Sequence, residues 1–310
     1  MNIEIPWRST GSAIALLQSA IERAVSRPRN PLYAVFVDFK SAFDTGSREL
    51  ALKRLCESGV PPKLLSLLAA MLQTNSIRID DGVAINEAIP QSTGFAQGDN
   101  VSPLLFCLLI ADLPARITAR HPGVSLLMYA DDLVMYSPNL PFLRQALQTL
   151  SRYVNEVGLC INTKKTEAVK FRRGGKLASS DKLVLSNQRV KFVTNFTYLG
   201  VTLSYKGTRF SKHVDNRARR ALVAGTTIKS PQKLSLMTSL ALFDTKVAPV
   251  ASYGIELTWR HLSLKNLLSL DRVKSSFLKR TLCLHRTSKN AMVYCLAATP
   301  YFIDDLKSRF

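Results

Sequence analysis

The hydrophobic pattern of the first 204 residues alternates between helical and strand-like stretches. Residues 33–37 form a continuous apolar run, which is typical of a strand buried on both faces. Residues 126–136 form two strand-like runs that meet at two adjacent acidic residues, and this pattern predicts a β-hairpin. Apolar periodicity together with capping residues predicts helices over 14–25, 48–58, 61–73, 103–110 and 139–157.

Beyond about residue 205 the apolar pattern is helical only. Short strand-like runs precede this point, at 183–185, 190–193 and 196–203. Helices are then predicted over 210–228, 234–250 and 264–284. This change of period predicts a boundary near residue 205, between a mixed domain of residues 1–204 and a helical domain of residues 205–310. A mixed part followed by a helical part indicates the α+β class.

Three carboxylates stand where predicted strands end. Asp131 and Asp132 lie at the tip of the predicted hairpin, and Asp38 follows the apolar run 33–37. Adjacent carboxylates at the ends of buried strands repel one another and lose hydration, so they need solvent or a divalent cation. For the pair alone, a solvated turn is the simpler interpretation. If the strands are antiparallel neighbours, the three carboxylates come close enough to share two cations about 3.5 to 4 Å apart.

The charge of the chain is concentrated in its second half. The 310 residues carry a net charge of +20, yet residues 1–150 contain 13 basic and 13 acidic side chains, whereas residues 151–310 contain 29 and 9. A basic excess on one side favours a polyanion such as nucleic acid, with an anionic membrane as the weaker alternative. The longest apolar run, residues 104–111, is far shorter than the roughly 20 residues of a membrane span. We therefore expect no membrane partner.

Cysteine usage indicates a reducing compartment. The five cysteines are an odd number without pairing spacings, so we expect no disulfide framework. Cys283, His285 and Cys295 lack a close cysteine pair and a fourth ligand, so the spacing does not predict a zinc site. Residues 1–6 lack the pattern of a signal sequence. We expect an intracellular protein, nuclear or cytoplasmic, that is not secreted.

Five motifs in order closely resemble those of reverse transcriptases. The non-LTR (LINE-type) retrotransposon branch is most similar, because the first motif ends in Phe43-Asp44 and the second has the tail 102–106. Tyr253-Gly254 followed by Trp259 also resembles a segment that follows the polymerase in that branch. The resemblance covers residues 7 to about 300. The motifs are residues 37–44, 94–106, 129–132, 158–167 and 198–200.

The resemblance implies a right-hand polymerase fold with a palm and partial fingers in residues 1–204 and a basic helical thumb in residues 205–310. The implied activity is RNA-directed DNA polymerisation, in which deoxynucleoside triphosphates extend a DNA primer on an RNA template. Two Mg²⁺ ions, or Mn²⁺ as the alternative, would be held by Asp38, Asp131 and Asp132. Lys165 would give a proton to pyrophosphate. As a lone lysine in a basic stretch, it could equally be a solvated or phosphate-contacting charge.

The resemblance also implies binding roles for two further sets of residues. Phe43 would be the gate that collides with a ribose 2′-hydroxyl, and its alternative is an ordinary core phenylalanine. Gln97 and Gly98 would lie against the incoming nucleotide and template, and their alternative is a plain turn. Ser102 is explained as a helix cap. The primer grip would be Tyr198, Leu199 and Gly200, whose alternative is a hairpin turn.

The upstream limit of the resemblance affects the expected activity, and it leaves two other functions open. Family members carry, upstream of the segment that resembles residues 7–10, finger strands that clasp the triphosphate. We therefore expect an N-terminally truncated domain that extends a primer poorly by itself. One alternative is a catalytically silent element relic that only binds nucleic acid, and the other is a group II intron maturase. The sequence predicts no particular protein partner.

Overall fold

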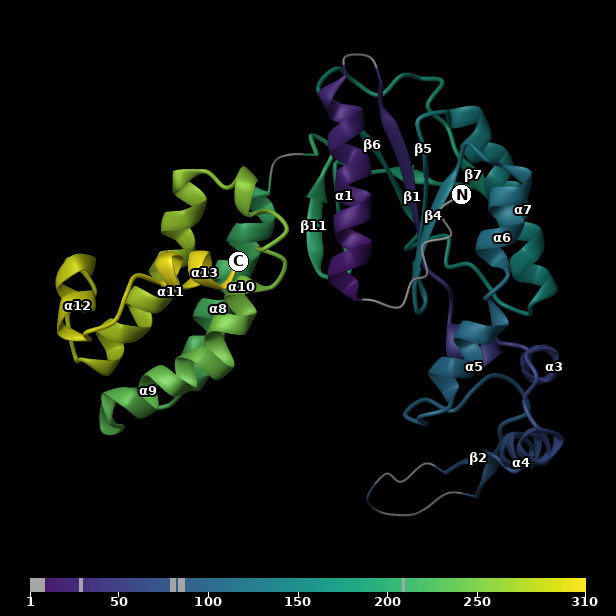
Figure 1. Cartoon of the computed structure of the whole chain (residues 1–310), viewed down its shortest axis with the longest axis horizontal. Helices are drawn as coiled ribbons and strands as arrows, with labels where there is room; N and C mark the ends of the chain where they lie inside the picture. Colours follow the sequence, from purple (N-terminus) through teal and green to yellow (C-terminus); the bar gives the residue numbers. More distant parts are fainter. Residues whose placement is uncertain (1–8, 28–29, 79–81, 83–86, 208–209) are drawn as a thin grey trace. The chain divides into compact units, whose positions relative to one another are not determined.

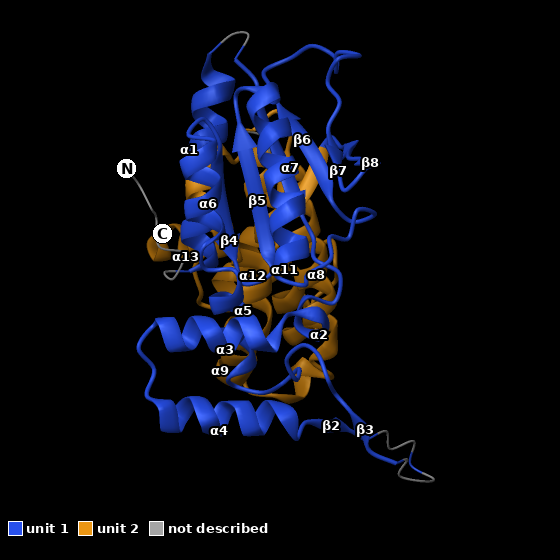
Figure 2. Ribbon diagram, turned by 90° about the vertical axis from the view of Figure 1, so that its right-hand side faces the viewer, with its two compact units in different colours: residues 1–13, 19–194 blue, residues 14–18, 195–310 orange. Residues whose placement is uncertain are grey.

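The described residues form two compact units. The computed structural model describes residues 9–27, 30–78, 82, 87–207 and 210–310. The first unit comprises residues 9–13 and 19–194, and the second comprises residues 14–18 and 195–310 (Figures 1 and 2). Helix α1 (Thr10–Ser26) supplies residues to both.

A five-stranded sheet lies at the centre of the first unit. Its order is β4-β5-β1-β6-β9, and β1 (Leu32–Val37) is antiparallel to both of its neighbours. All six residues of β1 are buried, which confirms the strand expected from the apolar run. The other strands are β4 (Ser125–Tyr129), β5 (Asp132–Ser137), β6 (Glu167–Phe171) and β9 (Lys191–Phe192).

Helices cover one face of this sheet and form the main core with it. Helices α6 and α7 lie over strands β4 and β5 (Figure 2). Alternate residues of β1, namely Tyr33, Val35 and Val37, pack into the same core as these helices, because successive side chains of a strand point to opposite faces. The helices are α2 (Ala42–Thr45), α3 (Arg48–Glu57), α4 (Pro62–Gln73), α5 (Ser102–Leu109), α6 (Leu113–Arg120) and α7 (Leu140–Glu156).

One segment of the described chain, Ser102–Arg120, is long and apolar enough to cross a membrane by length and composition alone. In the structure it forms two helices, α5 and α6. Phe106, Leu109 and Leu113 from this segment are completely buried in the core of the first unit. Packing within the unit therefore accounts for the apolar composition.

Two short hairpins complete the first unit. Strands β2 (Ser76–Ile77) and β3 (Ile89–Pro90) pair antiparallel, with Ile77 opposite Ile89. The sequence also predicts a hairpin with strands at 77–79 and 83–85 around a turn at 80–82, but residues 79–81 and 83–86 lie outside the described residues. Strands β7 (Val184–Leu185) and β8 (Gln188–Arg189) form the second hairpin.

After residues 14–18, the second unit begins with a hairpin, which the sequence places in the first domain, and continues as helices beyond residue 210. Strands β10 (Asn195–Tyr198) and β11 (Val201–Ser204) pair antiparallel. The longest helices, α8 (Ser211–Thr227) and α11 (Leu264–Thr281), pack on each other. The remaining elements are η1 (Pro231–Lys233), α9 (Leu236–Leu242), η2 (Phe243–Val247), α10 (Ala248–Ser252), η3 (Trp259–His261), α12 (Asn290–Leu296) and α13 (Phe302–Arg309).

Two boundaries differ from the expected ones. The units divide between Thr194 and Asn195 and not near residue 205, because β11 packs on α8 and so the hairpin belongs to the helical unit. The helix expected over 234–250 is interrupted by the π-helical turn η2. Pro249 follows this turn and has no N–H to donate to the carbonyl four residues earlier, which favours a local change of helix type. The assignment of the units to palm and thumb stays a prediction.

Candidate active site

The three predicted carboxylates lie where the adjacent strands β1, β4 and β5 end or begin. Strand β1 ends at Val37, which lies opposite Leu133 of β5 in the antiparallel register. Asp38 and Asp132 are therefore the next residues on neighbouring strands, at the same edge of the sheet. Asp131 lies in the turn of the β4–β5 hairpin, whose last pair is Tyr129 with Asp132. The predicted hairpin with both acids at its tip is confirmed.

Electrostatics link these three carboxylates. The pKa of Asp132 is raised, first by burial at the sheet edge and then by the negative charges of Asp131 and Asp38. Asp132 is still exposed to solvent. A raised pKa means that the ionised form is disfavoured in the folded protein, and a bound cation would offset that cost.

The carboxylates fit a divalent cation by donor type and strand position. Carboxylate oxygens are the ligands that hard cations such as Mg²⁺ prefer. Within the described part of the chain, however, no group of three or more His, Cys, Asp or Glu side chains is arranged so that it could hold a metal ion. Convergence of the three side chains on a metal therefore stays a prediction.

The segment 162–166 is hydrogen-bonded to both backbone groups of Asp38. The N–H of Asn162 donates to the carbonyl oxygen of Asp38 at 2.7 Å, and the N–H of Asp38 donates to Oγ1 of Thr166 at 3.2 Å. Lys165 belongs to this turn, and its side chain is exposed. The structure thus brings the turn that carries Lys165 to the residue that ends β1. It does not distinguish a proton donor from a solvated lysine.

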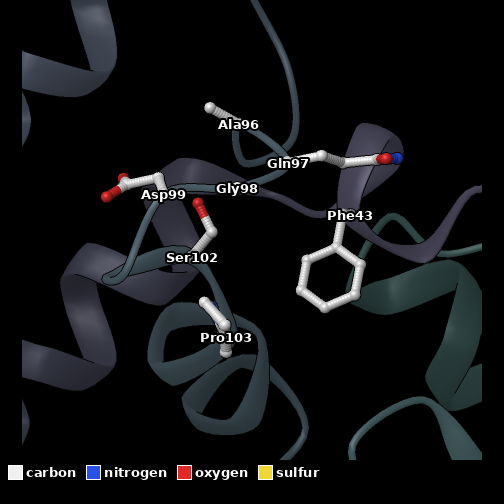
Figure 3. A pocket seen from close by; sticks show the side chains of 7 residues that line it. All are labelled: Phe43, Ala96, Gln97, Gly98, Asp99, Ser102 and Pro103. Atoms are coloured by element: carbon white, nitrogen blue, oxygen red, sulfur yellow. The ribbon is translucent and has the colours of Figure 1, made fainter. Parts of the chain in front are cut away.

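The three predicted nucleotide-contacting residues line one cavity of about 290 Å³. Figure 3 shows Phe43 on one wall and the loop of Gln97 and Gly98 across from it. The full lining is Phe43, Ala96, Gln97, Gly98, Asp99, Ser102 and Pro103. The structure therefore brings together residues 43, 97 and 98, which are far apart in the sequence.

Phe43 combines a core contact with a place in the cavity wall. Its ring is half-buried and packs on the ring of Phe106 with 5.1 Å between centroids. Phe106 itself is completely buried. Both interpretations of Phe43 thus have a structural basis, because one side of the ring packs on the core and the residue also lines the cavity.

The two walls are joined by backbone contacts. The N–H of Phe95 donates to the carbonyl oxygen of Phe43 at 2.5 Å, and the N–H of Gly94 donates to that of Gly46 at 3.1 Å. Gly94 has φ +69°, and a Cβ atom there would lie 2.3 Å from the carbonyl group of Asp44. Only glycine permits this approach of the two segments.

A half-buried arginine holds the loop that precedes the cavity. Arg48 donates from Nε to the carbonyl oxygen of Gly94 at 2.5 Å and from Nη1 to those of Leu72 and Gln91 at 2.5 and 2.6 Å. Nη2 reaches the carbonyl oxygen of Thr93 at 3.3 Å. Burial lowers the pKa of Arg48. The sequence offers no signal for this role, because the acceptors are backbone atoms of distant segments.

The amide of Gln97 is oriented by Asp44. Gln97 Nε2 donates to Asp44 Oδ1 at 3.2 Å, and so the amide nitrogen is directed at the carboxylate. In the sequence, Asp44 is only the last residue of the first motif. The structure adds its contact with the side chain of Gln97. The contact links the first two motifs through side chains as well as through the backbone.

Ser102 is not a helix cap, which corrects the expectation. It is the first residue of α5, the N-cap position belongs to Val101, and no side chain there makes a capping bond. Asp99 Oδ1 accepts the N–H of Val101 instead, at 3.2 Å. Ser102 is 2% exposed, and its Oγ has no hydrogen-bond partner among the described residues. Buried hydroxyl groups without a partner are uncommon, so Ser102 is a residue of the cavity wall that the sequence did not identify as a binding residue.

The predicted primer-grip residues form a hairpin turn in the second unit. Tyr198 pairs with Val201 at the ends of β10 and β11. Leu199 and Gly200 between them have φ of +45° and +80°. Positive φ at both central residues is typical of a tight two-residue hairpin turn. Whether the turn also grips a primer stays a prediction.

Comparison with known proteins identifies the family. The family model described as "Reverse transcriptase (RNA-dependent DNA polymerase)" matches residues 7–203. The chain is 25% identical over 259 residues to the RNA-directed DNA polymerase from mobile element jockey of Drosophila melanogaster, which covers 78% of this chain and 28% of that protein. It is 26% identical over 284 residues to the Pol polyprotein from type-1 retrotransposable element R2 of Popillia japonica, covering 86% of this chain and 38% of that protein. The chain thus spans well under half the length of these relatives.

A solved structure supports the fold. The apo telomerase of Candida tropicalis superposes with a TM-score of 0.53 at 10% identity, covering 92% of this chain and 46% of that chain. This likeness agrees with the predicted right-hand polymerase fold of the α+β class. The family match over residues 7–203 shows that the chain belongs to the reverse transcriptase (RNA-dependent DNA polymerase) family, with relatives among non-LTR retrotransposons.

Proposed function

We propose that this chain is the polymerase part of a retrotransposon protein, which extends a DNA primer on an RNA template by two-metal nucleotidyl transfer. The observation that carries the proposal is the position of Asp38 and Asp132, which follow or begin neighbouring antiparallel strands beside Asp131. Membership of the reverse transcriptase family supports it.

Asp38 and Asp131 hold the cations in this proposal, and Asp132 has a lesser role. Two Mg²⁺ ions, or Mn²⁺ in their place, would supply Lewis-acid chemistry that activates the primer hydroxyl and stabilises the leaving pyrophosphate. The raised pKa of Asp132 supports this role, because it reflects a site where negative charge is costly until a cation is present. Lys165, on the turn hydrogen-bonded to Asp38, delivers a proton to pyrophosphate.

The cavity between Phe43 and residues 96–99 binds the deoxynucleoside triphosphate and the templating base. Phe43 rests on Phe106, so the ring has little freedom to move away from a ribose 2′-hydroxyl. Gln97, whose amide is held by Asp44, keeps one wall in a defined orientation. Positioning of this kind can lower a barrier by several kcal/mol.

The test is primer extension on an RNA template by the full chain, with and without Mg²⁺. Asp131→Asn keeps the size of the side chain and removes the charge, and we expect it to reduce extension at least about a hundredfold because a cation ligand is lost. Glu57→Gln is the matched control, since Glu57 is an exposed acid elsewhere in the first unit. Measurable extension by Glu57→Gln that Asp131→Asn matches would refute the metal role of Asp131.

The same experiment separates the alternative of a silent relic. Salt-sensitive binding of an RNA–DNA duplex without any Mg²⁺- or Mn²⁺-dependent extension would support a nucleic-acid-binding protein that lacks polymerase activity. A group II intron maturase would instead require activity on a structured intron RNA, which a splicing assay with such an RNA measures.

A further inference from the structure

The turn of residues 198–200 is fitted against the ring of Tyr253, within the second unit. Tyr253 donates its hydroxyl hydrogen to the carbonyl oxygen of Leu199 at 2.8 Å. A Cβ atom at Gly200 would lie 2.9 Å from the ring, which is too close for any other residue without movement. The ring therefore fixes this turn from one side.

His213 fixes the backbone of Tyr253 in turn. The buried imidazole accepts the N–H of Thr202 at Nδ1, 3.3 Å away, so the ring hydrogen is on Nε2, which donates to the carbonyl oxygen of Tyr253 at 3.1 Å. Burial lowers the pKa of His213 to about 4, which keeps the ring neutral at physiological pH. Strand β11, helix α8 and the Tyr253 segment are joined by these contacts.

Arg217 lies one helical turn after His213, and its guanidinium carbon is 4.9 Å from the centroid of the Tyr253 ring. Stacking on the ring sets the plane of the guanidinium group. Its Nε is buried and has no hydrogen-bond partner among the described residues. No carboxylate in that part of the chain forms an ion pair with it.

The charged residues around Arg217 do not compensate the charge of its guanidinium group. Burial is the main cause that lowers the pKa of Arg217, and the charge of Arg220 adds to the effect. Glu256 attracts it, but only at a distance beyond an ion pair. Nε of this half-buried guanidinium has no acceptor among the described residues, so an acceptor from outside the chain that reaches the guanidinium group would lower the free energy of this arrangement.

We propose that Arg217, oriented by Tyr253, binds a phosphate group of a nucleic-acid strand at the turn of residues 198–200. A phosphate group accepts hydrogen bonds from the planar guanidinium fork in a geometry that a point charge does not match. The exposed neighbours Arg219 and Arg220 on α8 add positive charge around the same helix. Identification of the strand as the primer rests on the proposed polymerase function, whereas the phosphate contact does not.

A purely structural role makes a different prediction. If Arg217 only braces the Tyr253 ring, its loss would lower thermal stability and leave the salt dependence of nucleic-acid binding unchanged. If it binds phosphate, its loss releases fewer counterions on binding, and the slope of log K against log salt falls by about one.

The experiment is fluorescence anisotropy of an RNA–DNA duplex with the full chain over a range of salt, alongside thermal unfolding. We expect Arg217→Ala to weaken binding about tenfold or more at about 0.1 M salt and to reduce the slope by about one. Arg219→Ala is the matched control, because it removes the same charge from an exposed position of the same helix, and we expect a loss of no more than about threefold. Arg217→Lys keeps the charge but not the fork, so its affinity should fall between the wild type and Arg217→Ala.

The inference would be overturned if the affinity of Arg217→Ala and the slope of its salt dependence equalled those of the wild type or of Arg219→Ala. Should Arg217→Ala fail to fold, Arg217→Lys decides: wild-type affinity in that variant would exclude a contact that needs the guanidinium fork. Primer extension is measured separately. Weakened binding by Arg217→Ala in a chain that never extends a primer would refute the proposed function and leave the phosphate contact standing.

Discussion

Ser102 contributes a hydroxyl group that the folded first unit itself does not use. Its Oγ is buried in the wall of the cavity and has no partner among the described residues. The desolvation of such a group costs about 1 to 3 kcal/mol, which a ligand that hydrogen-bonds to it would recover. Ser102 is therefore a candidate for contact with whatever occupies the cavity.

We expect Ser102→Ala to raise the free energy of unfolding by about 1 kcal/mol or more, because no hydrogen bond is lost and the desolvation cost of the buried hydroxyl is removed. The KM for the incoming nucleotide should rise severalfold in primer extension. Ser137→Ala is the matched control: Ser137 is also buried, but its hydroxyl donates to the carbonyl oxygen of Gly123 at 2.7 Å and accepts the N–H of Asn139 at 3.1 Å. That variant should lose about 1 to 2 kcal/mol of stability. An unchanged KM for Ser102→Ala would exclude a ligand contact.

Phe43 is the second residue whose two interpretations can be separated by measurement. Phe43→Ala removes the contact with Phe106, so the protein should be less stable whatever the role of the ring. If the ring excludes a 2′-hydroxyl, the ratio of ribonucleotide to deoxyribonucleotide incorporation should also rise at least tenfold. Lost packing alone would lower the rates with both nucleotides and leave the ratio unchanged, so competition between the two nucleotides decides the matter.

The residue scale shows where sequence reasoning was sufficient and where it was not. Asp38, Asp131 and Asp132 could be found because each interrupts an apolar run at the end of a strand. Arg48 could not, because its acceptors are carbonyl oxygens at residues 72, 91, 93 and 94, whose positions depend on the tertiary structure. Ser102 was misread because serine before proline is a common helix start, whereas Asp99 supplies the local hydrogen bond here.

At the scale of elements, hairpin β10–β11 depends on helix α8 through His213. Neutral His213 links Thr202 of the hairpin to Tyr253 by two hydrogen bonds. Its pKa of about 4 in the folded protein is below the ordinary value of 6.5. Because the folded state then binds fewer protons than the unfolded state, the contribution of His213 to stability is fully present above pH 6.5 and is lost as pH falls toward 4.

We expect the free energy of unfolding to fall by about 2 kcal/mol between pH 7 and pH 5 through this residue alone. Carboxylates also titrate as the pH is lowered, so the measurement is the difference between the wild type and His213→Gln in urea unfolding at both values. The variant should be less stable at pH 7 and lose less stability on acidification. Parallel pH profiles of the two proteins would contradict this account.

The elements themselves differ in how far they could be predicted. Strand β1 and hairpin β4–β5 were predicted correctly because a short apolar run and an interrupted run are local signals. The division of the units at residue 194 was not, because it depends on β11 packing on α8, a contact that no local pattern records. The π-helical turn of residues 243–247 likewise has no sequence period of its own.

At the scale of the whole molecule, we expect charge rather than apolar surface to govern the choice of partner. The net charge of +20 comes entirely from residues 151–310, and the apolar segment of residues 102–120 is used in the core of the first unit. We expect the affinity for an RNA–DNA duplex to fall at least tenfold between about 50 and 200 mM salt, since counterion release drives such binding. Cosedimentation with anionic vesicles that persists at about 0.5 M salt would instead indicate apolar insertion into lipid, against this expectation.

The contact between Gly94 and Asp44 couples the two walls of the cavity, so that they are expected to move together. A displacement of one wall must be followed by the other, because the chain segments touch at backbone atoms and no flexible side chain lies between them. Phe43 would set the discrimination between sugars, and Gln97 would set the fit of the base pair. Both properties then depend on the same distance between the two walls. Substitutions at the two residues should therefore have non-additive effects, and variants selected for acceptance of an altered sugar should also misincorporate bases more often.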